Sequence, residues 1–377
     1  MRIGANVKQK EGYKAFIPDR FPPGGASFVT QPETIRLLAE ATLRLGKLDG
    51  ITKLLPDIGF FIFMYVKKEA AYSSQIEGTR AKLSDALQAE IEKVPGLPQD
   101  VDDILHYIQA MDAGLERLKD FPLTLRLLKD VHEVLMTDAR SDHDPRPGQF
   151  RNDQNWIDGT SPFDARYVPP PAHELLRTLG DLEMFLHKSK EIPPLLKAGI
   201  AHAQFETIHP FRDGNGRMGR LLMTFYLCQQ GILARPVLYL SAFLKKHRKA
   251  YFERLDEYRE GSVEAWLQFF LKGVIEVATE AIATCDAIVM LRERDMVTIA
   301  LLPRKTSVGA LAVLKELYKS PIINARRIEE VAGVSRQGAY NLARRLVKEG
   351  ILHPQEKRYG QTYKHKEYLK LFEQNGT

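Results

Sequence analysis

The chain has 377 residues and a mass of 42.9 kDa, with 44% hydrophobic and 27% charged residues. These proportions are typical of globular proteins and exclude a disordered or fibrous chain, while the length predicts two or three domains. The longest apolar run, residues 58–66, is far shorter than the ~20 residues needed to cross a bilayer. No secretory signal opens the chain, and Cys228 and Cys285 lie in apolar segments. We therefore expect a cytoplasmic protein without a disulfide framework or a cysteine metal site.

The positive charge is concentrated near the C-terminus. The net charge is +6 overall, but residues 301–377 carry +8 and the first 300 residues carry −2. A basic module on a nearly neutral body is typical of a part that contacts nucleic acid. A solvated charged surface would give the same count, so the charge alone does not identify a partner.

The elements predicted in chain order are mainly helices. Residues 1–28 are rich in proline and glycine and predict an extended, non-helical arm. Apolar residues at helical spacing then predict helices from about residue 31, over 58–75, and over 101–118, 123–139, 172–187, 193–208, 216–228, 245–259 and 263–292. Residues 148–171 differ, because aromatic and aliphatic residues alternate there with turn residues, which predicts a short β-hairpin.

The chain is expected to have three parts. They are residues 1–100, with the arm and the first helices, residues 101–300, a helical core, and residues 301–377, a separate module. Pro303 ends the long helical pattern, which sets the last boundary near residue 300. Within the module we expect helices over 308–319, 325–332 and 335–349, and then a hairpin over 351–364 with its tip at Tyr359 and Gly360. This order predicts a winged helix on a mainly α protein.

The third helix of this module carries a basic stripe opposite an apolar one. The stripe consists of Arg336, Tyr340, Arg344 and Lys348, which recur every fourth residue. Such a face fits the phosphate backbone of DNA. Winged helices also bind proteins, so the partner of this face is DNA or a protein.

Residues 208–220 place polar chemistry on a tight loop between two apolar helices. Pro210 ends the first helix, while Gly214 and Gly216 let the backbone approach a ligand. The next helix therefore opens with unpaired N–H groups, which, together with the helix dipole, favour a phosphate group. The loop predicts an anion site.

Charged side chains in the same segment fit a polyphosphate and its metal ion. Arg217 and Arg220 are three residues apart and project toward roughly the same side, where they can bind phosphate oxygens. Asp213 supplies the oxygen ligand that Mg²⁺ requires, and His209 supplies a base that titrates near neutrality. His202 stands seven residues earlier without a third ligand, so we expect it to have a packing role rather than a metal role.

The segment from His209 to Arg220 resembles the signature of the Fic family, HPFx(D/E)GNGRxxR, at every fixed position. The resemblance implies an enzyme that transfers AMP from ATP to a Ser, Thr or Tyr hydroxyl of a protein, itself included, and releases pyrophosphate. It implies that His209 deprotonates the hydroxyl, that Asp213 holds Mg²⁺ and that Phe211 anchors the loop. It also implies that the phosphates are held by the amides of Gly214, Asn215 and Gly216, the Asn215 side chain, Arg217 and Arg220.

Residues 149–170 extend this resemblance. With Asn155, Trp156 and Ile157 at their centre, they resemble the flap of the family, whose exposed strand edge aligns the target by main-chain pairing. An ordinary core hairpin is the alternative for this segment.

A helix after the loop resembles the one that carries two aromatic residues beside the adenine, here Tyr251 and Phe252. Relatives often have Tyr at the second place and an Asn seven residues further, where this chain has Arg259. The adenine and ribose contacts of the family therefore do not transfer directly, although an aromatic wall still suits a purine.

Upstream, residues 73–78 resemble the inhibitory motif (S/T)xxxE(G/N) that precedes the catalytic core in many Fic proteins. Ser73 and Glu77 are four residues apart, which places them on one helix face, and Gly78 can end the helix. The resemblance implies that Glu77 pairs with Arg220 and so prevents productive binding of the γ-phosphate. It also leaves open a second role for Glu77 in activating water for AMP removal. An exposed surface glutamate is the alternative interpretation.

Two other functions are consistent with these motifs. One is a DNA-binding regulator whose Fic core senses nucleotide, which predicts salt-sensitive duplex binding without AMP incorporation. The other is transfer of another nucleotide or of a phosphate, because the loop contacts phosphates and scarcely reads the base. The expected partners are ATP with Mg²⁺, a protein target, and DNA or a protein at the winged helix. A homodimer stays open, and no membrane contact is expected.

Overall fold

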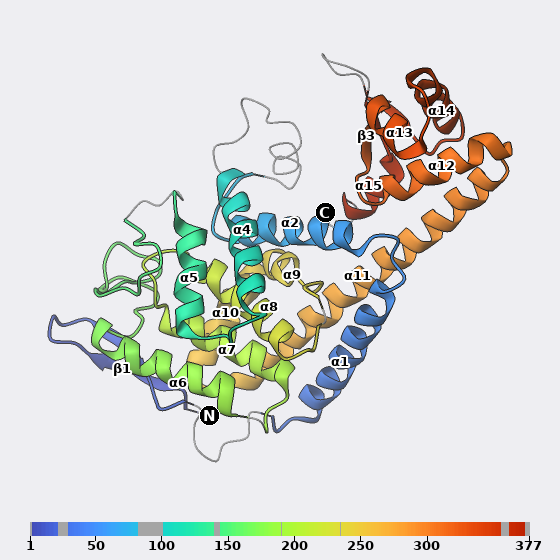
Figure 1. The fold of residues 1–377 in the computed structure, drawn as a ribbon. Helices are drawn as coiled ribbons and strands as arrows, with labels where there is room; N and C mark the ends of the chain where they lie inside the picture. The colour runs from blue at the N-terminus through green and yellow to red at the C-terminus, as the bar shows by residue number, and fades with distance from the viewer. Residues whose placement is uncertain are drawn as a thin grey trace. The chain divides into compact units, whose positions relative to one another are not determined.

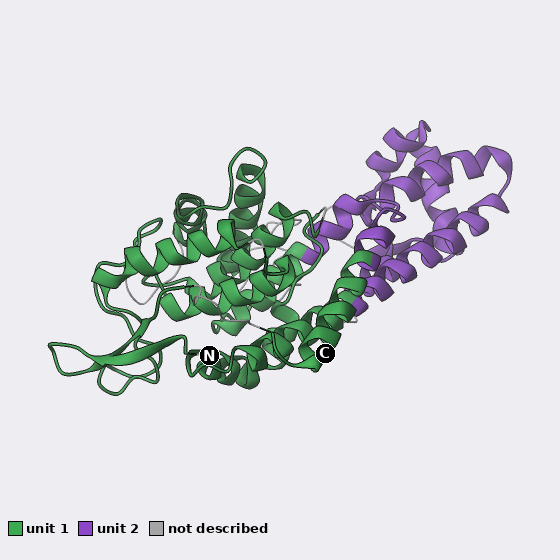
Figure 2. Cartoon of the chain, turned by 90° about the horizontal axis from the view of Figure 1, so that it is seen from below, with its two compact units in different colours: residues 1–46, 66–278 green, residues 47–65, 279–377 purple. Residues whose placement is uncertain are grey.

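We describe a computed structural model of the chain over residues 2–21, 29–81, 101–138, 144–189, 191–233, 235–355 and 362–373. These residues form mainly helices, with two small antiparallel sheets (Figure 1). The chain divides into two compact units, residues 1–46 with 66–278 and residues 47–65 with 279–377 (Figure 2). No helix among the described residues is long and apolar enough to cross a membrane.

The first unit contains the N-terminal strands and most of the helices. Its elements are β1 (Gly4–Lys8), β2 (Lys14–Pro18), α4 (Val101–Arg117), α5 (Leu125–Met136), the 3-10 helix η1 (Ala172–Glu174), α6 (Leu175–Lys188), α7 (Pro194–Ile208), α8 (Asn215–Gln229), α9 (Ser241–Lys246) and α10 (Arg248–Arg259). The helices α1 (Pro32–Thr52), α2 (Ile58–Ile76) and α11 (Val263–Ala300) continue from one unit into the other. The nine predicted helical segments are thus confirmed, although residues 245–259 form two helices and the last helix extends to Ala300.

The N-terminal arm is a β-hairpin, which the sequence analysis did not predict. β1 and β2 pair antiparallel, with Gly4 opposite Pro18 and Lys8 opposite Lys14. Gly12 closes the turn with a φ of 101°, a backbone conformation that glycine adopts without strain. The Phe16 amide then donates to the Val168 carbonyl at 2.9 Å. The hairpin therefore lies beside residues 148–171.

The hairpin predicted over residues 148–171 is reduced to a single β-bridge between Ile157 and Tyr167. Side chains replace the backbone ladder: the Asp164 carboxylate accepts hydrogen bonds from the Thr160 and Ser161 amides, and the Gln154 amide group donates to the Pro169 carbonyl. Three consecutive prolines, 169–171, also lack the N–H that a ladder needs. The prediction of two paired strands was therefore wrong, and the segment is a folded loop.

The helices α7 and α8 form the centre of the first unit and carry the candidate site between them. Every residue from Leu195 to Ile208 is buried, and most of α8 is buried as well. Small residues allow this depth: a Cβ added at Gly199 would lie 2.8 Å from the Phe270 ring, and one added at Gly114 would lie within 3 Å of the Phe225 ring. The loop that joins two such helices is held at both ends by a packed core.

The second unit contains α12 (Arg304–Leu317), β3 (Ile322–Asn324), α13 (Ala325–Ala332), α14 (Arg336–Lys348), β4 (His353–Gln355), β5 (Thr362–Lys364) and α15 (Lys366–Glu373). Its sheet has the order β3-β5-β4 and is antiparallel. Asn324 and Ser335 cap α13 and α14 with their side chains, and Gly333 ends α13 in the left-handed conformation. The three predicted helices are confirmed, β3 and α15 were not predicted, and the predicted hairpin tip lies outside the described residues.

The predicted domain boundaries at residues 100 and 300 do not coincide with these units. α11 runs without interruption from Val263 to Ala300, and the division between the units falls inside it. The three-part division stays a prediction.

Candidate functional site

The loop between α7 and α8 turns sharply at two left-handed residues. His209 ends α7 with a φ of 50°, and its amide donates to the Phe205 carbonyl. Gly214 precedes α8 with a φ of 77°, and a Cβ there would lie 2.8 Å from the Met136 sulfur. Glycine at this position therefore serves both backbone conformation and close packing.

The loop is closed by its own side chains. Phe211 is completely buried. The Phe211 amide donates to Asn215 Oδ1 at 2.8 Å, and Asn215 Nδ2 donates to the Phe211 carbonyl at 2.8 Å. Both ends of the Asn215 amide are thus used within the loop, whereas the sequence analysis expected this side chain to hold phosphate.

His132 on α5 packs against the loop and forms a hydrogen bond with it. Its ring stacks on Phe211 at 3.7 Å with nearly parallel planes. The Gly148 amide donates to Nδ1, so Nε2 carries the proton and donates to the Asp213 carbonyl at 3.0 Å. Burial lowers the pKa of His132 to about 4, so the ring is neutral at pH 7 and keeps this arrangement.

Arg151 fastens residues 148–171 to the same loop. Its buried guanidinium donates to the carbonyls of His209, Asp153, Pro170 and Ile208, at distances from 2.5 to 3.3 Å. The Arg151 amide donates to the Pro210 carbonyl as well. One side chain therefore connects the end of α7 with both ends of the folded loop.

His209 is neutral in this environment. Its side chain is 18% exposed, and burial together with the charges of Arg151 and Arg259 lowers the pKa of His209 to about 3. The nearest carboxylate is Glu206, whose Oε2 lies 3.9 Å from His209 Nδ1. A neutral imidazole is the form that a general base requires.

Arg220 is a buried cation held by the end of α2. Its Nε donates to Ser73 Oγ at 2.7 Å, while Nη2 donates to the Ser73 carbonyl at 3.0 Å and to Glu77 Oε1 at 2.7 Å. Burial acts against the charge, but the neighbouring Glu77 carboxylate, together with Tyr251 and Tyr107, offsets it and raises the pKa of Arg220. The structure thus brings together Ser73, Glu77 and Arg220, which are far apart in the sequence.

The Glu77 carboxylate lies against the first turn of α8. A Cβ added at Gly216 would lie within 3 Å of Glu77 Oε1, so the carboxylate touches this stretch of backbone. α2 ends at Ile76, and Gly78 turns the chain away with a φ of 106°. A negative group therefore occupies the helix N-terminus where the sequence predicts phosphate.

Arg217 points to other partners than Arg220 does. Its side chain is buried, its Nη1 lies 3.9 Å from Asp103 Oδ1, and its Nη2 lies 3.9 Å from Asp213 Oδ1. Nη2 also contacts the Met136 sulfur at 3.3 Å, and Nε has no hydrogen-bond partner. Asp213 is 39% exposed and accepts a hydrogen bond from the Gly214 amide. The cation and the carboxylate thus lie side by side at the loop.

The aromatic pair predicted beside the adenine is divided between core and surface. Tyr251 is 1% exposed, and its hydroxyl is hydrogen-bonded to His202 Nε2 at 2.9 Å. His202 is buried too, as expected for a packing role. Phe252 is half-buried, and Arg248 lies over its ring. Arg259 stacks on Tyr167 and is paired with Asp256, so its charge is already partnered.

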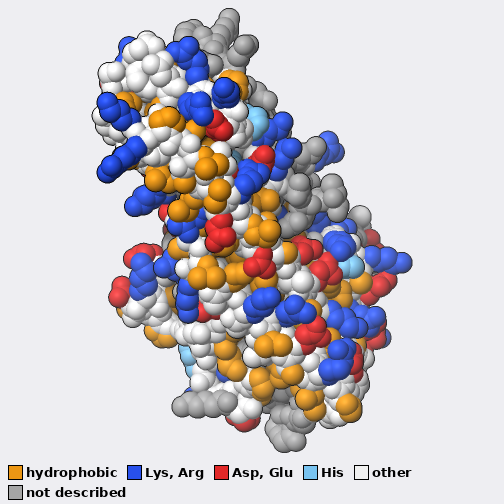
Figure 3. All heavy atoms as spheres, turned by 90° about the vertical axis from the view of Figure 1, so that its right-hand side faces the viewer, with side chains coloured by type: hydrophobic (Ala, Val, Ile, Leu, Met, Phe, Trp, Pro, Cys, Tyr) orange, Lys and Arg blue, Asp and Glu red, His pale blue; other side chains and the backbone are white. Residues whose placement is uncertain are grey.

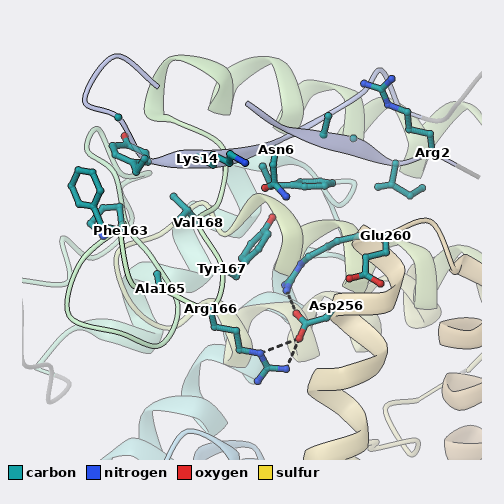
Figure 4. A pocket seen from close by; sticks show the side chains of 18 residues that line it. Arg2, Asn6, Lys14, Phe163, Ala165, Arg166, Tyr167, Val168, Asp256 and Glu260 are labelled. Atoms are coloured by element: carbon teal, nitrogen blue, oxygen red, sulfur yellow. Dashed lines mark hydrogen bonds and ion pairs between the residues drawn. The ribbon is translucent and has the colours of Figure 1, made fainter. Parts of the chain in front are cut away.

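The residues at the centre of the predicted flap have different surroundings. Asn155 donates its amide to the Phe211 carbonyl at 3.0 Å, so it supports the loop, whereas Trp156 is 39% exposed. Ile157 forms the bridge to Tyr167. A cavity of about 950 Å³ lies between this segment, the β1–β2 hairpin and the end of α10, and Figure 4 shows Arg166 beside Asp256 at its edge.

Four buried polar residues of the site were missed by the sequence analysis. They are Glu69, His132, Arg151 and Glu206. Glu69 on α2 accepts hydrogen bonds from the Ser241 amide and hydroxyl, and burial raises its pKa. For Glu69, a charged residue inside a largely apolar helix was the available signal, because such groups are rarely buried without a partner.

Comparisons with known proteins find family matches that include the loop between α7 and α8. Residues 35–116 match the Fic/DOC family N-terminal domain, and residues 122–227 match the Fic/DOC family domain. A probable protein adenylyltransferase of Aquifex aeolicus is 36% identical over 27% of this chain and 29% of its own length. The protein adenylyltransferase Fic of Aedes aegypti is 30% identical over 45% of this chain and 30% of its own length. The matches thus span about 30% of the length of these curated relatives.

Solved structures with the same fold extend over more of the chain. A Fic family protein from Desulfovibrio desulfuricans G20 has a TM-score of 0.59 at 19% identity, and the match covers 89% of this chain and 97% of that one. A Fic domain containing signaling protein from Bacteroides thetaiotaomicron has a TM-score of 0.53 at 16% identity over 68% of this chain and 97% of that one. Because the two family domains follow each other and the second contains the whole loop from His209 to Arg220, the chain belongs to the Fic/DOC family.

Proposed function

We propose that this protein is a self-inhibited adenylyltransferase that transfers AMP from ATP to a Ser, Thr or Tyr hydroxyl of a protein. The observation that carries the proposal is the single loop that joins a neutral His209 to the N-terminus of α8 and its arginines. The names of the curated relatives support the same reaction.

In this reaction His209 takes the proton of the target hydroxyl, whose oxygen forms a bond to the α-phosphorus of ATP. The bond from that phosphorus to the oxygen bridging to the β-phosphate breaks, and pyrophosphate leaves. The amides of Gly214, Asn215 and Gly216 can hold phosphate oxygens, and the buried Arg217 and Arg220 can bind the outer phosphates. A general base of this kind contributes about 10²–10⁴-fold to the rate.

Asp213 fits a magnesium site that the nucleotide completes. Its carboxylate is partly exposed beside the loop, and the described residues contain no group of three or more metal-ligating side chains. Mg²⁺ is commonly held by one carboxylate with phosphate oxygens and water, and when bound it neutralises phosphate charge. Asp213 would be the protein ligand.

The contact between Glu77 and Arg220 supports self-inhibition. The carboxylate uses the guanidinium and touches Gly216, so a γ-phosphate would meet both an occupied cation and a negative charge. ATP would then bind in a pose that does not react. If Glu77 moves, its carboxylate is free to activate water for AMP removal, which is a second role in the proposal.

The segment around Asn155, Trp156 and Ile157 is proposed to dock the target. The exposed Trp156 and the cavity beside the segment support this role. Asn155 and Arg151 hold the segment on the loop that carries His209. A docked chain would therefore lie at a defined distance from the His209 side chain.

A test uses purified wild type, Glu77→Gly and Glu77→Gly/His209→Ala with Mg²⁺, α-labelled ATP and a cell extract. Labelled protein with Glu77→Gly that disappears in the double variant supports both the transfer and the inhibition. Competition by GTP, CTP and UTP identifies the nucleotide, which separates AMP transfer from transfer of another group. Absence of label from Glu77→Gly in the presence of bound ATP contradicts the transferase.

A second candidate is DNA binding by the C-terminal unit. Its element order and three-stranded sheet support a winged helix, and Arg336, Arg344 and Lys348 are exposed on α14 while Tyr340 is half-buried. Figure 3 views the chain from the side of α12 to α14 and shows Lys and Arg side chains distributed over that surface. Salt-sensitive binding of duplex DNA that weakens in Arg344→Ala supports it, and a protein partner at the same face is the other outcome.

A further inference from the structure

Glu206 is a buried carboxylate whose position the reaction above does not use. It lies one turn before His209 on α7 and is 6% exposed. Its Oε2 is 3.9 Å from His209 Nδ1, and its Oε1 has no hydrogen-bond partner. His209 Nδ1 makes no hydrogen bond of normal geometry either, although the Glu206 backbone carbonyl lies near enough to the ring to favour its protonated form. The carboxylate thus has one unpartnered oxygen, while its other oxygen is the one that approaches the unpartnered Nδ1, and leaving buried polar atoms unpaired costs free energy.

Space for this carboxylate is provided by a neighbouring helix. A Cβ added at Gly219 on α8 would lie 2.6 Å from Glu206 Oε1 and 3.1 Å from His202 Nδ1. Glycine thus lets the Glu206 carboxylate lie directly against the backbone of α8, and a larger residue would require the carboxylate to shift.

The charges that face Glu206 come from several elements. Arg220 on α8 and Arg259 on α10 favour its ionised form, whereas burial and the Glu77 carboxylate at the end of α2 oppose it. His202 and His209, from α7 and its end, are both neutral at pH 7. The balance raises the pKa of Glu206 to about 7, so both of its protonation states are populated near neutrality.

We propose that Glu206 is a positioning residue for His209, accepting a hydrogen bond from Nδ1–H and so presenting Nε2 as the base. The proposal rests on the proposed transferase function. Hydrogen bonding requires the 3.9 Å separation to shorten by about 1 Å. Catalytic hydrogen bonds are often long before substrate binds and tighten in the reactive complex. Ionised Glu206 then also stabilises the imidazolium that forms when His209 takes the hydroxyl proton.

The same arrangement connects the inhibitory contact with the base. While Glu77 is bound to Arg220, its charge favours protonated Glu206, which accepts a hydrogen bond less well. When Glu77 leaves, that repulsion ends. Release of Glu77 thus frees Arg220 for phosphate and favours the form of Glu206 that orients His209.

The test compares Glu206→Gln and Glu206→Asp, each in Glu77→Gly, by self-labelling with α-labelled ATP from about pH 5 to about pH 9. We expect Glu206→Gln to lower kcat by about 10- to 100-fold, the usual cost of a misplaced catalytic group, with the KM for ATP little changed. The Glu77→Gly enzyme should lose rate as the pH falls through the pKa of Glu206. Glu206→Gln should lack this acid limb, and Glu206→Asp should keep it and recover part of the rate.

Glu264→Gln is the matched control, because it makes the same change in a carboxylate that binds Thr30 and Gln31 away from the loop. It should leave kcat and the pH profile unchanged. An unchanged kcat in Glu206→Gln, or a loss that appears equally in the KM for ATP, overturns the proposal, since the second result assigns Glu206 to Arg220 and phosphate binding.

A measurement without turnover separates this proposal from the transferase. ¹⁵N NMR of the histidine rings reports which nitrogen of His209 carries the proton. We expect the Nδ1–H form in Glu77→Gly and its partial loss in Glu77→Gly/Glu206→Leu. If Glu77→Gly labels no protein yet the tautomer depends on Glu206, the transferase fails and the positioning role stands. A tautomer that is indifferent to Glu206→Leu refutes the positioning role whatever the activity.

Discussion

The proposed inhibitory contact involves two side-chain groups, the Glu77 carboxylate and the Ser73 hydroxyl, and their contributions can be separated by replacing Ser73 with alanine. Ser73 Oγ accepts from Arg220 Nε at 2.7 Å, and both side chains are completely or almost completely buried. The Ser73 carbonyl also accepts from Arg220 and is unaffected by the substitution. Ser73→Ala therefore removes one of the three hydrogen bonds between Arg220 and residues 73–77, while Glu77 stays in place.

A hydrogen bond to a charged group contributes about 1.5–3 kcal/mol. If Arg220 gives up this bond when it turns to phosphate, its loss favours the ATP-competent form by about 10-fold at the lower value, since ~1.4 kcal/mol is a factor of ten. Glu77→Gly should activate more strongly than Ser73→Ala, because it removes both a hydrogen bond to Arg220 and the negatively charged carboxylate that lies against Gly216. Coupling of ~1–3 kcal/mol corresponds to about 5–150-fold for that variant.

The assay is initial AMP incorporation or pyrophosphate release at fixed ATP, with Ser73→Ala, Glu77→Gly and the double variant. We expect the double variant to be more active than Glu77→Gly, because the Ser73 hydroxyl still holds Arg220 when Glu77 is absent. Ser74→Ala is the control: Ser74 is buried next to Ser73, but its hydroxyl has no hydrogen-bond partner. Activation by Ser74→Ala as large as that by Ser73→Ala, or a double variant no more active than Glu77→Gly, would refute the reasoning.

Other consequences concern the metal, the core and the pH. Asp213→Asn should raise the Mg²⁺ concentration needed for half-maximal rate by about 10- to 100-fold while ATP still binds without metal, as measured by titration calorimetry; an unchanged requirement excludes Asp213 as the ligand. Gly114→Ala should destabilise the first unit by about 1–3 kcal/mol in thermal unfolding, because its Cβ would overlap the Phe225 ring, and Gly180→Ala, with open space around it, should not. Because burial lowers the pKa of His132 to about 4, below its unfolded value of about 6.5, the stability it contributes is present above pH 6.5 and is lost as the pH falls toward 4. A melting temperature that falls as steeply over this pH range in His132→Gln as in the wild type would contradict that assignment.

The sequence allowed most helices and the centre of the loop to be predicted. Apolar periodicity located α7 and α8, and Pro210 with Gly214 located the turn between them, because these signals are local. The meeting of Ser73 and Glu77 with Arg220 was anticipated only through the family resemblance, since no local pattern relates residues so far apart.

The supporting residues could not be predicted in this way. His132 and Glu206 sit at positions that an amphipathic pattern treats as core, and their partners are backbone groups or a histidine on other turns. The N-terminal hairpin had a usable signal in Gly12 between two short alternating runs. The expected strands over 148–171 failed for the opposite reason, because Asp164 and Gln154 satisfy backbone groups that pairing would otherwise use.

The left-handed backbone of His209 affects the choice of an inactive variant. At a φ of 50°, histidine and asparagine are tolerated better than most residues, while alanine pays a conformational cost. His209→Ala therefore removes the imidazole and also strains the turn whose carbonyl Arg151 and Asn155 hold. His209→Asn removes the imidazole with less disturbance of the turn. A binding partner trapped by the asparagine variant but not by the alanine variant would have recognised the shape of this turn rather than the chemistry of the ring.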